Sequence, residues 1–398
     1  MLTRGQRVAN VVDEPDSRLC RRSNVVGVFH ALTSLRPHGG TMDAMTMSDR
    51  TRPVRPGEEL DIAAVETYLR AEIPGLDGSP EVSQFPAGAS NLTYLLQFGE
   101  RELILRRPPF GRKAKSAHDM SREARVMTAL QKVYRYVPQV VAFCDDPGII
   151  GSDFYVMKPI PGIILRRDLP PGLVLSKGET RRLCTNVLDR LIELHSVDFQ
   201  GAGLGDFGKP EGYVRRQIEG WCGRYVKART PNAPSYETVM TWLHDSMPQE
   251  VRHCVIHGDY RFDNVVLDAE DPFEVIGVLD WEMATIGDPL MDLGNSLAYW
   301  VGKKDPLLLR VFRLQPTHLP GMLDRDEVVD YYCERTGVTC DDFTFYRVYG
   351  VFRLVVIMQQ IYYRYHHRQT TNRRFAKFIW LVKYLERYLK REIRKAEG

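Results

Sequence analysis

The residues with the clearest chemical potential lie between positions 253 and 282. An apolar run leads into His257, Gly258 and Asp259, and Asn264 follows five residues after Asp259. Asp280 comes sixteen residues after Asn264, at the end of another apolar run. Strand ends at this spacing can place a carboxamide and a carboxylate around one hard cation, and such oxygen ligands suit Mg²⁺. Asp259 would then accept a hydroxyl proton, so the pattern predicts metal-assisted phosphoryl transfer.

Each of these residues also has a simpler interpretation. A loop aspartate usually caps a helix or closes a turn, and His257 before a glycine is expected to shape the loop rather than to carry a proton. Asp263 is expected to be exposed. The full pattern is H-G-D-x-x-x-x-N followed by a strand and L-D. A chance match would need both the residue spacing and the strand context to coincide. The catalytic interpretation is therefore preferred for Asp259, Asn264 and Asp280.

The composition excludes several classes of protein. The 398 residues are 43% hydrophobic and 26% charged, as in globular proteins and unlike coiled coils, collagen-like repeats or mainly disordered chains. The 54 Lys and Arg against 51 Asp and Glu leave a net charge of +3, so we expect no nucleic-acid partner. No run approaches the roughly 18–20 apolar residues of a membrane-spanning helix, so no membrane insertion is expected. The seven scattered cysteines lack a C-x-x-C pair and favour a cytoplasmic location.

The chain divides into three segments. Residues 1–55 show little periodicity, and we expect a disordered leader or an over-extended start there. Residues 56–158 predict a small nucleotide-binding lobe, with helices over 60–73 and 121–133 and strands at 82–85, 92–98, 102–106 and 154–157. Two prolines and Gly162 indicate a stiff crossover at 158–162. Residues 159–398 predict a larger, mainly helical lobe, interrupted by strands at 255–257, 265–267 and 275–279.

The catalytic pattern resembles that of a known family. HGDYRFDNV followed by VLDWE is similar to the aminoglycoside phosphotransferase-like kinases, which are relatives of the protein-kinase fold. The longer pattern HGDYRxDN with DWExxxxGDPxxDL resembles the kinase-like domain associated with acyl-CoA dehydrogenases. The resemblance covers roughly residues 60–390 and implies an α+β, two-lobed protein-kinase-like fold. It also implies ATP and Mg²⁺ as cofactors.

The resemblance assigns roles to individual positions. Asp259 and Arg261 become the candidate catalytic residues, with Asp259 orienting the hydroxyl, and Asn264 and Asp280 become the candidate Mg²⁺ ligands. Four further residues are expected to support the site. They are His257; Asp288, which precedes a proline as a helix N-cap would; Asp292 in the first turn of the same helix; and His195, a buried histidine that braces the catalytic loop.

The nucleotide is expected to bind to the small lobe. Gly88, Ser90 and Asn91 lie between two strands and would contact phosphates, although a lone glycine there also suits a simple hairpin. No P-loop sequence is present. Arg106 replaces the lysine that protein kinases carry on their third strand, and Glu123 is expected to pair with it. The adenine pocket is expected to be lined by Met157, Lys158 and Ile160.

The sequence is compatible with more than one class of phosphoryl acceptor. Eleven Arg or Lys against two Glu between 364 and 395 suit either a solvated helix face or a site for an anionic acceptor such as coenzyme A. The resemblance favours a hydroxyacyl-CoA or hydroxy acid as the small-molecule hydroxyl acceptor, with an acyl-CoA dehydrogenase as a partner in trans. The alternatives are an aminoglycoside-type antibiotic phosphotransferase and a catalytically silent nucleotide-binding scaffold.

Overall fold

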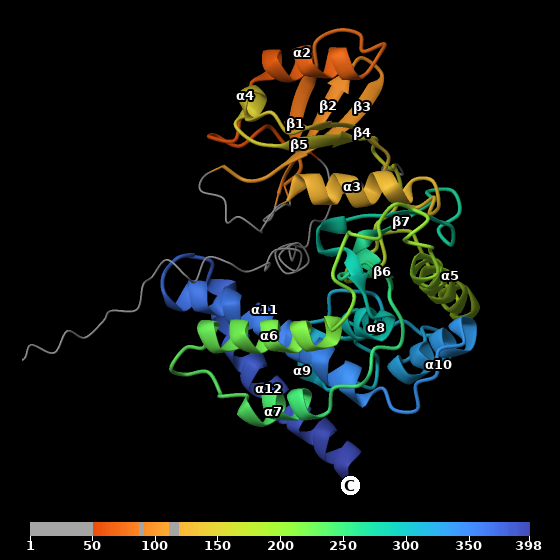
Figure 1. Cartoon of the computed structure of the whole chain (residues 1–398), viewed down its shortest axis with the longest axis vertical. Coiled ribbons are helices and arrows are strands. Elements are labelled where there is room, and N and C mark those ends of the chain that lie inside the picture. The colour runs from red at the N-terminus through yellow and green to blue at the C-terminus, as the bar shows by residue number, and fades with distance from the viewer. Residues whose placement is uncertain (1–50, 87–90, 111–118) are drawn as a thin grey trace, which may run out of the picture.

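The chain folds into a small lobe built on a sheet and a larger lobe built mainly of helices (Figure 1). The computed structural model describes residues 51–86, 91–110 and 119–398. The α+β, two-lobed architecture expected from the sequence is confirmed. Within the described part of the chain, no helix is both long and apolar enough to cross a membrane.

The small lobe is centred on a five-stranded antiparallel sheet. Its strands are β1 (Glu81–Gln84), β2 (Leu92–Phe98), β3 (Arg101–Arg107), β4 (Val140–Cys144) and β5 (Phe154–Met157). They pair in the order β1-β2-β3-β5-β4. Burial alternates along β2, so one face of the sheet packs inward. Helices α2 (Ile62–Glu72) and α4 (Pro147–Ile150) contribute to the apolar core on that face.

Helix α3 (Met120–Leu130) connects the two lobes. Asp119 caps its first turn by accepting a hydrogen bond from the backbone of Arg122. The buried face of α3 belongs to the same continuous core as the helical lobe. The guanidinium of Arg122 donates to Ala284 O at 3.2 Å and to Thr285 Oγ1 at 3.0 Å, so α3 is bound directly to the segment that follows the DWE motif.

Two two-stranded sheets and a set of helices build the larger lobe. β6 pairs with β9, and β7 pairs with β8. The wholly buried α8 packs against α11, the longest helix. The bounds are β6 (Cys254–Ile256), β7 (Val265–Leu267), β8 (Val275–Val278), β9 (Thr285–Gly287), α5 (Lys177–His195), α6 (Tyr213–Ala228), α7 (Glu237–Asp245), α8 (Pro289–Leu297), α9 (Leu307–Val311), α10 (Arg325–Thr336), α11 (Thr344–His366) and α12 (Phe378–Glu397), with short 3₁₀ turns η2 (Phe262–Asn264), η3 (Trp281–Met283) and η4 (Arg373–Lys377).

The sequence predicted seven of the nine strands in the described part of the chain but missed two, and it predicted most of the helices of the larger lobe only as a class. β4 and β9 were not predicted, because neither run alternates clearly and β9 has only three residues. Order also begins earlier than residue 56, since the backbone of Arg52 exchanges hydrogen bonds of 2.9 and 2.8 Å with Gln84. Residues 1–50 of the expected leader lie outside the described residues. The boundary expected between residues 158 and 159 stays a prediction.

Helices α8 and α11 approach each other at two glycines. A Cβ atom on Gly350 would lie 2.0 Å from Gly294 O, and one on Gly294 would lie 2.5 Å from Tyr346 O. Both contacts are with backbone, which cannot move aside without shifting a whole helix. The close crossing of α8 and α11 therefore requires glycine at these positions.

We expect Gly350→Ala to destabilise the protein by about 1–3 kcal/mol, because the added methyl group overpacks the crossing of α8 and α11. Urea unfolding would measure the change. Gly223→Ala in α6 is the matched control: nothing lies within 4 Å of a Cβ there, so alanine should be neutral or stabilising. Equal effects of the two substitutions would contradict the packing argument.

Candidate active site

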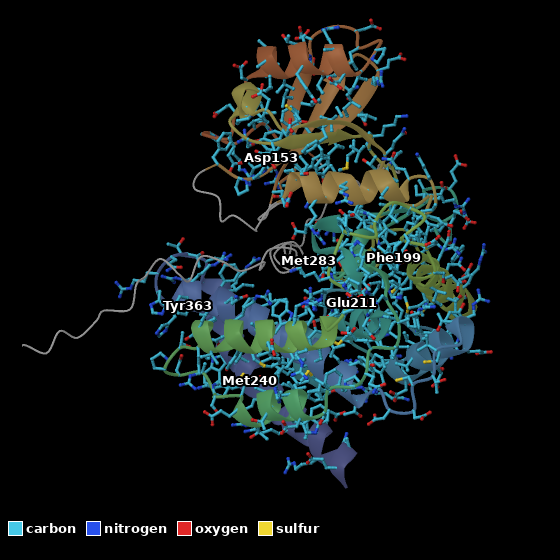
Figure 2. All side chains as sticks on the ribbon, in the orientation of Figure 1. Asp153, Phe199, Glu211, Met240, Met283 and Tyr363 are labelled. Carbon is cyan, nitrogen blue, oxygen red and sulfur yellow. The ribbon has the colours of Figure 1, made fainter. Side chains whose placement is uncertain are left out.

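The catalytic loop begins where β6 ends. Gly258 has a φ of +79°, and a Cβ atom there would lie 2.7 Å from Met283 O. Met283 lies just below α3, between the two lobes (Figure 2). Glycine at 258 therefore supplies both the left-handed turn and the space against η3. This turn directs the chain so that Asp259 follows at the lobe boundary.

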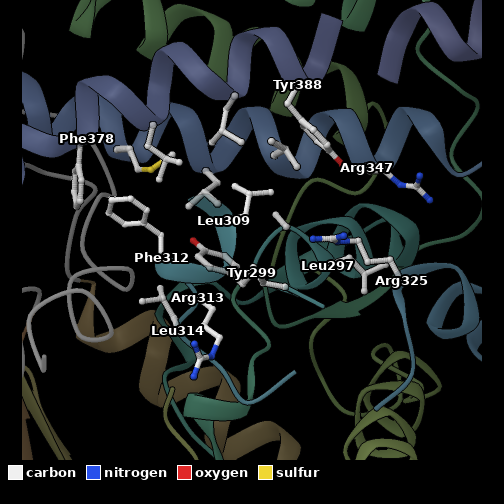
Figure 3. A pocket seen from close by; sticks show the side chains of 17 residues that line it. Leu297, Tyr299, Leu309, Phe312, Arg313, Leu314, Arg325, Arg347, Phe378 and Tyr388 are labelled. Atoms are coloured by element: carbon white, nitrogen blue, oxygen red, sulfur yellow. The ribbon is translucent and has the colours of Figure 1, made fainter. Parts of the chain in front are cut away.

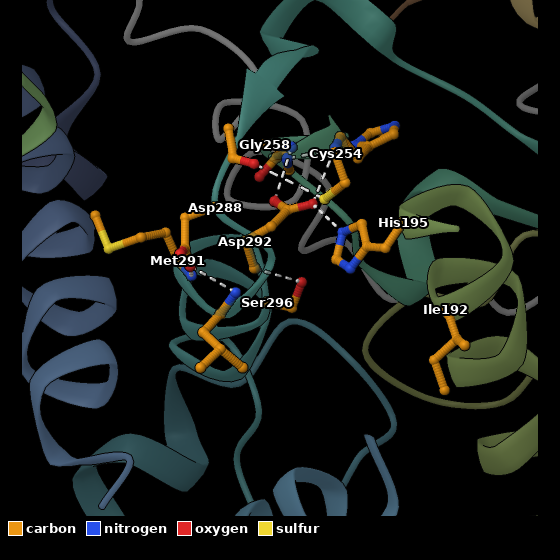
Figure 4. A network of polar contacts seen from close by, with 12 residues as sticks. Ile192, His195, Cys254, Gly258, Asp288, Met291, Asp292 and Ser296 are labelled. Atoms are coloured by element: carbon orange, nitrogen blue, oxygen red, sulfur yellow. Dashed lines mark hydrogen bonds and ion pairs between the residues drawn. The ribbon is translucent and has the colours of Figure 1, made fainter. Parts of the chain in front are cut away.

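The carboxylate of Asp292, in the first turn of α8, holds this loop in place (Figure 4). The backbone amide of His257 donates to Asp292 Oδ2 at 2.9 Å, and that of Gly258 donates to Asp292 Oδ1 at 2.8 Å. His195 Nε2 lies 3.2 Å from Asp292 Oδ2. Burial alone would raise the pKa of the Asp292 carboxyl, but the hydrogen bond and charge of His195 hold that pKa below its ordinary value.

The two supporting histidines act at different distances from the loop. His195 reaches it only through Asp292, while its Nδ1 lies 2.7 Å from the hydroxyl of Tyr332. His257 Nε2 donates to Leu279 O at 3.0 Å, and His257 Nδ1 accepts from the amide of Asp259 at 3.3 Å. Burial lowers the pKa of His257, which favours the neutral ring that this pair of contacts requires. His257 thus connects the catalytic loop to the residue before Asp280.

Asp288 begins α8 as expected. Its carboxylate accepts hydrogen bonds from the amides of Leu290 and Met291, and Pro289 occupies the first turn. Its second oxygen accepts from the amide of Val251 at 2.8 Å. The predicted N-cap is confirmed, and Asp288 also holds the segment that leads into β6.

Asp259 is almost fully buried among cationic and amide groups. Arg261 Nη2 lies 3.2 Å from Asp259 Oδ2, and Asn264 Nδ2 donates to the Asp259 backbone carbonyl at 2.8 Å. Arg353, from α11, donates to Gly258 O at 2.8 Å. Burial raises the pKa of Asp259, while Arg261 and Arg353 oppose that rise. Within the described part of the chain, Asp259 Oδ1 has no hydrogen-bond partner, so it retains an unused acceptor position.

Arg261 lies at the centre of the loop. Its side chain is 1% exposed, its Nε lies 3.3 Å from Asp263 Oδ1, and its guanidinium packs 4.7 Å from the ring of Tyr299. The sequence-based expectation that Asp263 is exposed is wrong, since only 6% of Asp263 is accessible. Its burial follows from this ion pair, which turns its side chain toward Arg261 instead of toward water.

The two predicted metal ligands are joined through the backbone of Leu279. In the β7–β8 pair, Val265 faces Val278, and the amide of Leu279 donates to Asn264 O at 2.8 Å. Asp280 follows directly and adopts a φ of +69°, which is costly for a residue other than glycine and common at functional sites. The described residues contain no cluster of three or more His, Cys, Asp or Glu that could hold a metal. The oxygens of Asn264 and Asp280 nevertheless fit Mg²⁺, which completes its shell with water and phosphate.

Arg106 pairs with acidic residues of both lobes. Its Nη1 lies 3.1 Å from Glu123 Oε1, and its Nη2 lies 2.9 Å from Asp280 Oδ1 and 3.5 Å from Glu282 Oε2. These carboxylates raise the pKa of Arg106 although burial opposes them. Asn91 Nδ2 donates to Glu282 Oε2 at 3.3 Å. The expected Arg106–Glu123 pair is present, and Glu282 joins it.

The structure describes some, but not all, of the other residues that are predicted to contact the nucleotide. The amide of Lys158 donates to Gln139 O at 2.9 Å, and a Cβ atom on Gly277 would lie 2.7 Å from Ile160, so the crossover packs against β8. Met157 packs partly buried on the core of the helical lobe. Gly88 and Ser90 lie outside the described residues.

Sequence reasoning missed three residues at the site: Arg353 and Gln315, which contact the catalytic loop, and Glu282, which contacts Arg106. Arg353 is the sole charged residue in the apolar run 348–363, and that isolation is a signal that could have been used. Glu282 belonged to the quoted DWE motif but received no role. Gln315 Oε1 accepts from the amide of Phe262 at 2.9 Å, and nothing local in the sequence marks it.

Comparisons with known proteins agree with this geometry. Residues 81–324 match the phosphotransferase enzyme family APH. Acyl-CoA dehydrogenase family member 10 of Mus musculus is 38% identical over 317 residues, which are 79% of this chain and 29% of that protein. The chain spans 29% to 42% of the length of the curated relatives that it matches.

Solved structures show the same fold. A Ralstonia eutropha JMP134 protein with the provisional name aminoglycoside phosphotransferase has a TM-score of 0.72 and 29% identity, over 85% of this chain and 99% of that one. The GDP and kanamycin complex of APH(2")-IIia has a TM-score of 0.55 at 18% identity, over 80% of this chain and 97% of that one.

We expect Asp292→Asn to destabilise the protein by about 2–3 kcal/mol, because an amide group would face backbone donors that now bind a charged acceptor. Asp206→Asn is the control, since the Asp206 side chain is 78% exposed. Because its pKa is lowered in the folded protein, the Asp292 carboxylate stabilises the fold at pH values above 3.8, the ordinary pKa of this group. This stabilisation is lost as the pH falls through the pKa of the folded state. In urea unfolding, the difference between the variant and wild type should therefore narrow below about pH 4; a constant difference would contradict the assignment.

Proposed function

The chain belongs to the APH phosphotransferase enzyme family, and we propose that it transfers the γ-phosphoryl group of ATP, with Mg²⁺, to a hydroxyl of a small molecule. The observation that carries this proposal is the buried carboxylate of Asp259, whose Oδ1 has no hydrogen-bond partner among the described residues. It lies in one loop with Asn264, and Asn264 is bonded to the backbone that precedes Asp280.

The chain's own residues would position the reactants. Asp259 orients the acceptor hydroxyl and accepts its proton, and Arg261 holds the carboxylate in place. Asn264 and Asp280 would hold Mg²⁺, which neutralises charge on the phosphates when it is bound. Phosphoryl transfer needs little covalent chemistry from the protein, so this arrangement contributes mainly through positioning and electrostatics.

Arg106 would contact the phosphates while Glu123 keeps its guanidinium oriented. One arginine here faces three carboxylates, those of Glu123, Asp280 and Glu282. Mg²⁺ bound at Asp280 would add positive charge beside these carboxylates. Gly88, Ser90 and Asn91 would complete the phosphate contacts, and the crossover residues 157–160 would contact the base.

The acceptor that we propose is a hydroxyacyl-CoA or a hydroxy acid. Its support is the similarity to a mouse protein named for acyl-CoA dehydrogenase, most of which lies beyond the matched region. An acyl-CoA dehydrogenase acting in trans would be the corresponding partner.

An aminoglycoside is the second candidate acceptor, because a structure of this fold was solved with kanamycin. A polycationic acceptor needs an acidic groove. The exposed side of η4 and α12 carries instead Arg373, Arg374, Lys377, Arg387 and Arg391, which disfavours it.

Calorimetric titration with Mg·ATP tests the nucleotide site. Wild type should bind, and Asp280→Asn should bind at least tenfold more weakly, because one anionic ligand of the metal is lost. The control is Asp271→Asn, in the turn between β7 and β8, where the side chain is 51% exposed. Folded wild-type protein that binds no nucleotide would overturn the site and favour the scaffold alternative.

A transfer assay tests the role of Asp259. With hydroxyacyl-CoA, hydroxy-acid and aminoglycoside acceptors, Asp259→Asn should lower kcat by about 10²–10⁴ while Mg·ATP binding persists, because the variant cannot take the hydroxyl proton. Phosphorylated product is measured by mass spectrometry. Full transfer by the variant, on an acceptor that wild type uses, would refute the assignment.

A further inference from the structure

A cavity lies beside Tyr299, between the end of α8 and helices α9, α10, α11 and α12 (Figure 3). Its empty volume, counted together with open solvent at the mouth, is about 860 Å³. Its walls are mainly apolar. They include Leu309, Phe312, Leu354, Met358, Leu381 and Leu385.

The cavity adjoins the catalytic residues through Tyr299. This residue lines the cavity, and its ring packs against Arg261, which in turn contacts Asp259. The hydroxyl of Tyr299 is buried without a hydrogen-bond partner among the described residues. A hydroxylated chain inside the cavity would therefore lie close to the catalytic loop.

The charges around the cavity are not evenly balanced. On one side, Arg325 makes hydrogen bonds of 3.0 and 2.9 Å to Asp305, and Arg347 contacts Asp326 and Glu392. These two arginines are compensated by carboxylates. Figure 3 places Arg313 away from them, below Tyr299 and Leu314.

Arg313 belongs to a cationic cluster with Arg167, Arg310 and His318. Arg313 and Arg167 share one carboxylate, that of the exposed Asp168. Burial lowers the pKa of His318. The charges of the three arginines lower it further, while the charge of Asp168 opposes them. Arg313 Nε and His318 Nδ1 are buried without hydrogen-bond partners in the described part of the chain. Two arginines share the carboxylate of Asp168, and Arg310 adds a third positive charge near His318, so the cluster carries an excess of positive charge.

We propose that the cavity binds an amphipathic anion, with its apolar chain against α11 and α12 and its anionic group on the cluster of Arg167, Arg310, Arg313 and His318. This assignment rests on the proposed function in one respect: it takes the bound ligand to be the phosphoryl acceptor. The anionic group can be the carboxylate of a free hydroxy acid or a phosphate of its coenzyme A thioester. Arginine suits both, since its guanidinium forms paired hydrogen bonds with carboxylate and phosphate oxygens.

Binding of straight-chain alkanoates to the full chain, measured by calorimetry without nucleotide, tests the cavity. From hexanoate to decanoate the affinity should rise by about fourfold per methylene, as burial of each CH₂ requires. Leu354→Trp fills the cavity and should abolish this rise. Decanoate should bind about tenfold more tightly than decanamide, and Arg313→Gln should remove that preference.

The controls separate this inference from the proposed function. Arg135→Gln, at a 70% exposed arginine paired with Glu274, should leave alkanoate binding unchanged. Arg310→Gln, on the exposed side of α9, repeats the charge test should Arg313→Gln fail to fold. If 3-hydroxydecanoate binds more tightly than its coenzyme A thioester, the anionic group is the carboxylate. If the thioester binds more tightly, the anionic group is a phosphate. No chain-length dependence, or equal binding of decanoate and decanamide, overturns the inference, while Mg·ATP binding still reports on the phosphotransferase site.

Discussion

The arrangement of the site depends on one buried carboxylate, that of Asp292. A charge without water must be compensated, and here the compensation comes from the amides of His257 and Gly258 and from His195. The N-terminal end of α8 adds favourable dipole charge. The catalytic loop can satisfy these contacts in only one orientation, so the position of Asp259 follows from the burial of α8.

The second constraint is the charge balance between the lobes. Arg106 reaches Glu123 with one terminal nitrogen and Asp280 with the other. A lysine could not make both contacts in this way, because its single ammonium lacks the planar fork of a guanidinium. The arginine that departs from the protein-kinase pattern is therefore suited to holding α3, β3 and the DWE segment together.

Local sequence patterns predicted the parts of the site that local geometry determines. The strand ends before His257 and Asp280, and the Asp288-Pro289 cap, follow from runs of a few residues. Asp263 was misjudged because its ion pair with Arg261 depends on how the loop folds back on itself. Arg353 and Gln315 act over 95 and 53 residues of sequence, and only the tertiary packing brings them to the loop. The cavity could not be predicted for the same reason, since residues from five separate helices line it.

Helix α11 links the cavity to the chemistry. Arg353 binds the carbonyl of Gly258, while Val351, Leu354 and Met358 on the same helix line the cavity. The crossing of Gly350 over Gly294 fixes α11 against α8, the helix that carries Asp292. Both ends of the Gly258 residue are therefore held by helices that cannot slide past each other: its amide by α8 and its carbonyl by α11. A ligand packed against α11 would consequently lie near a loop whose position is set by helix packing.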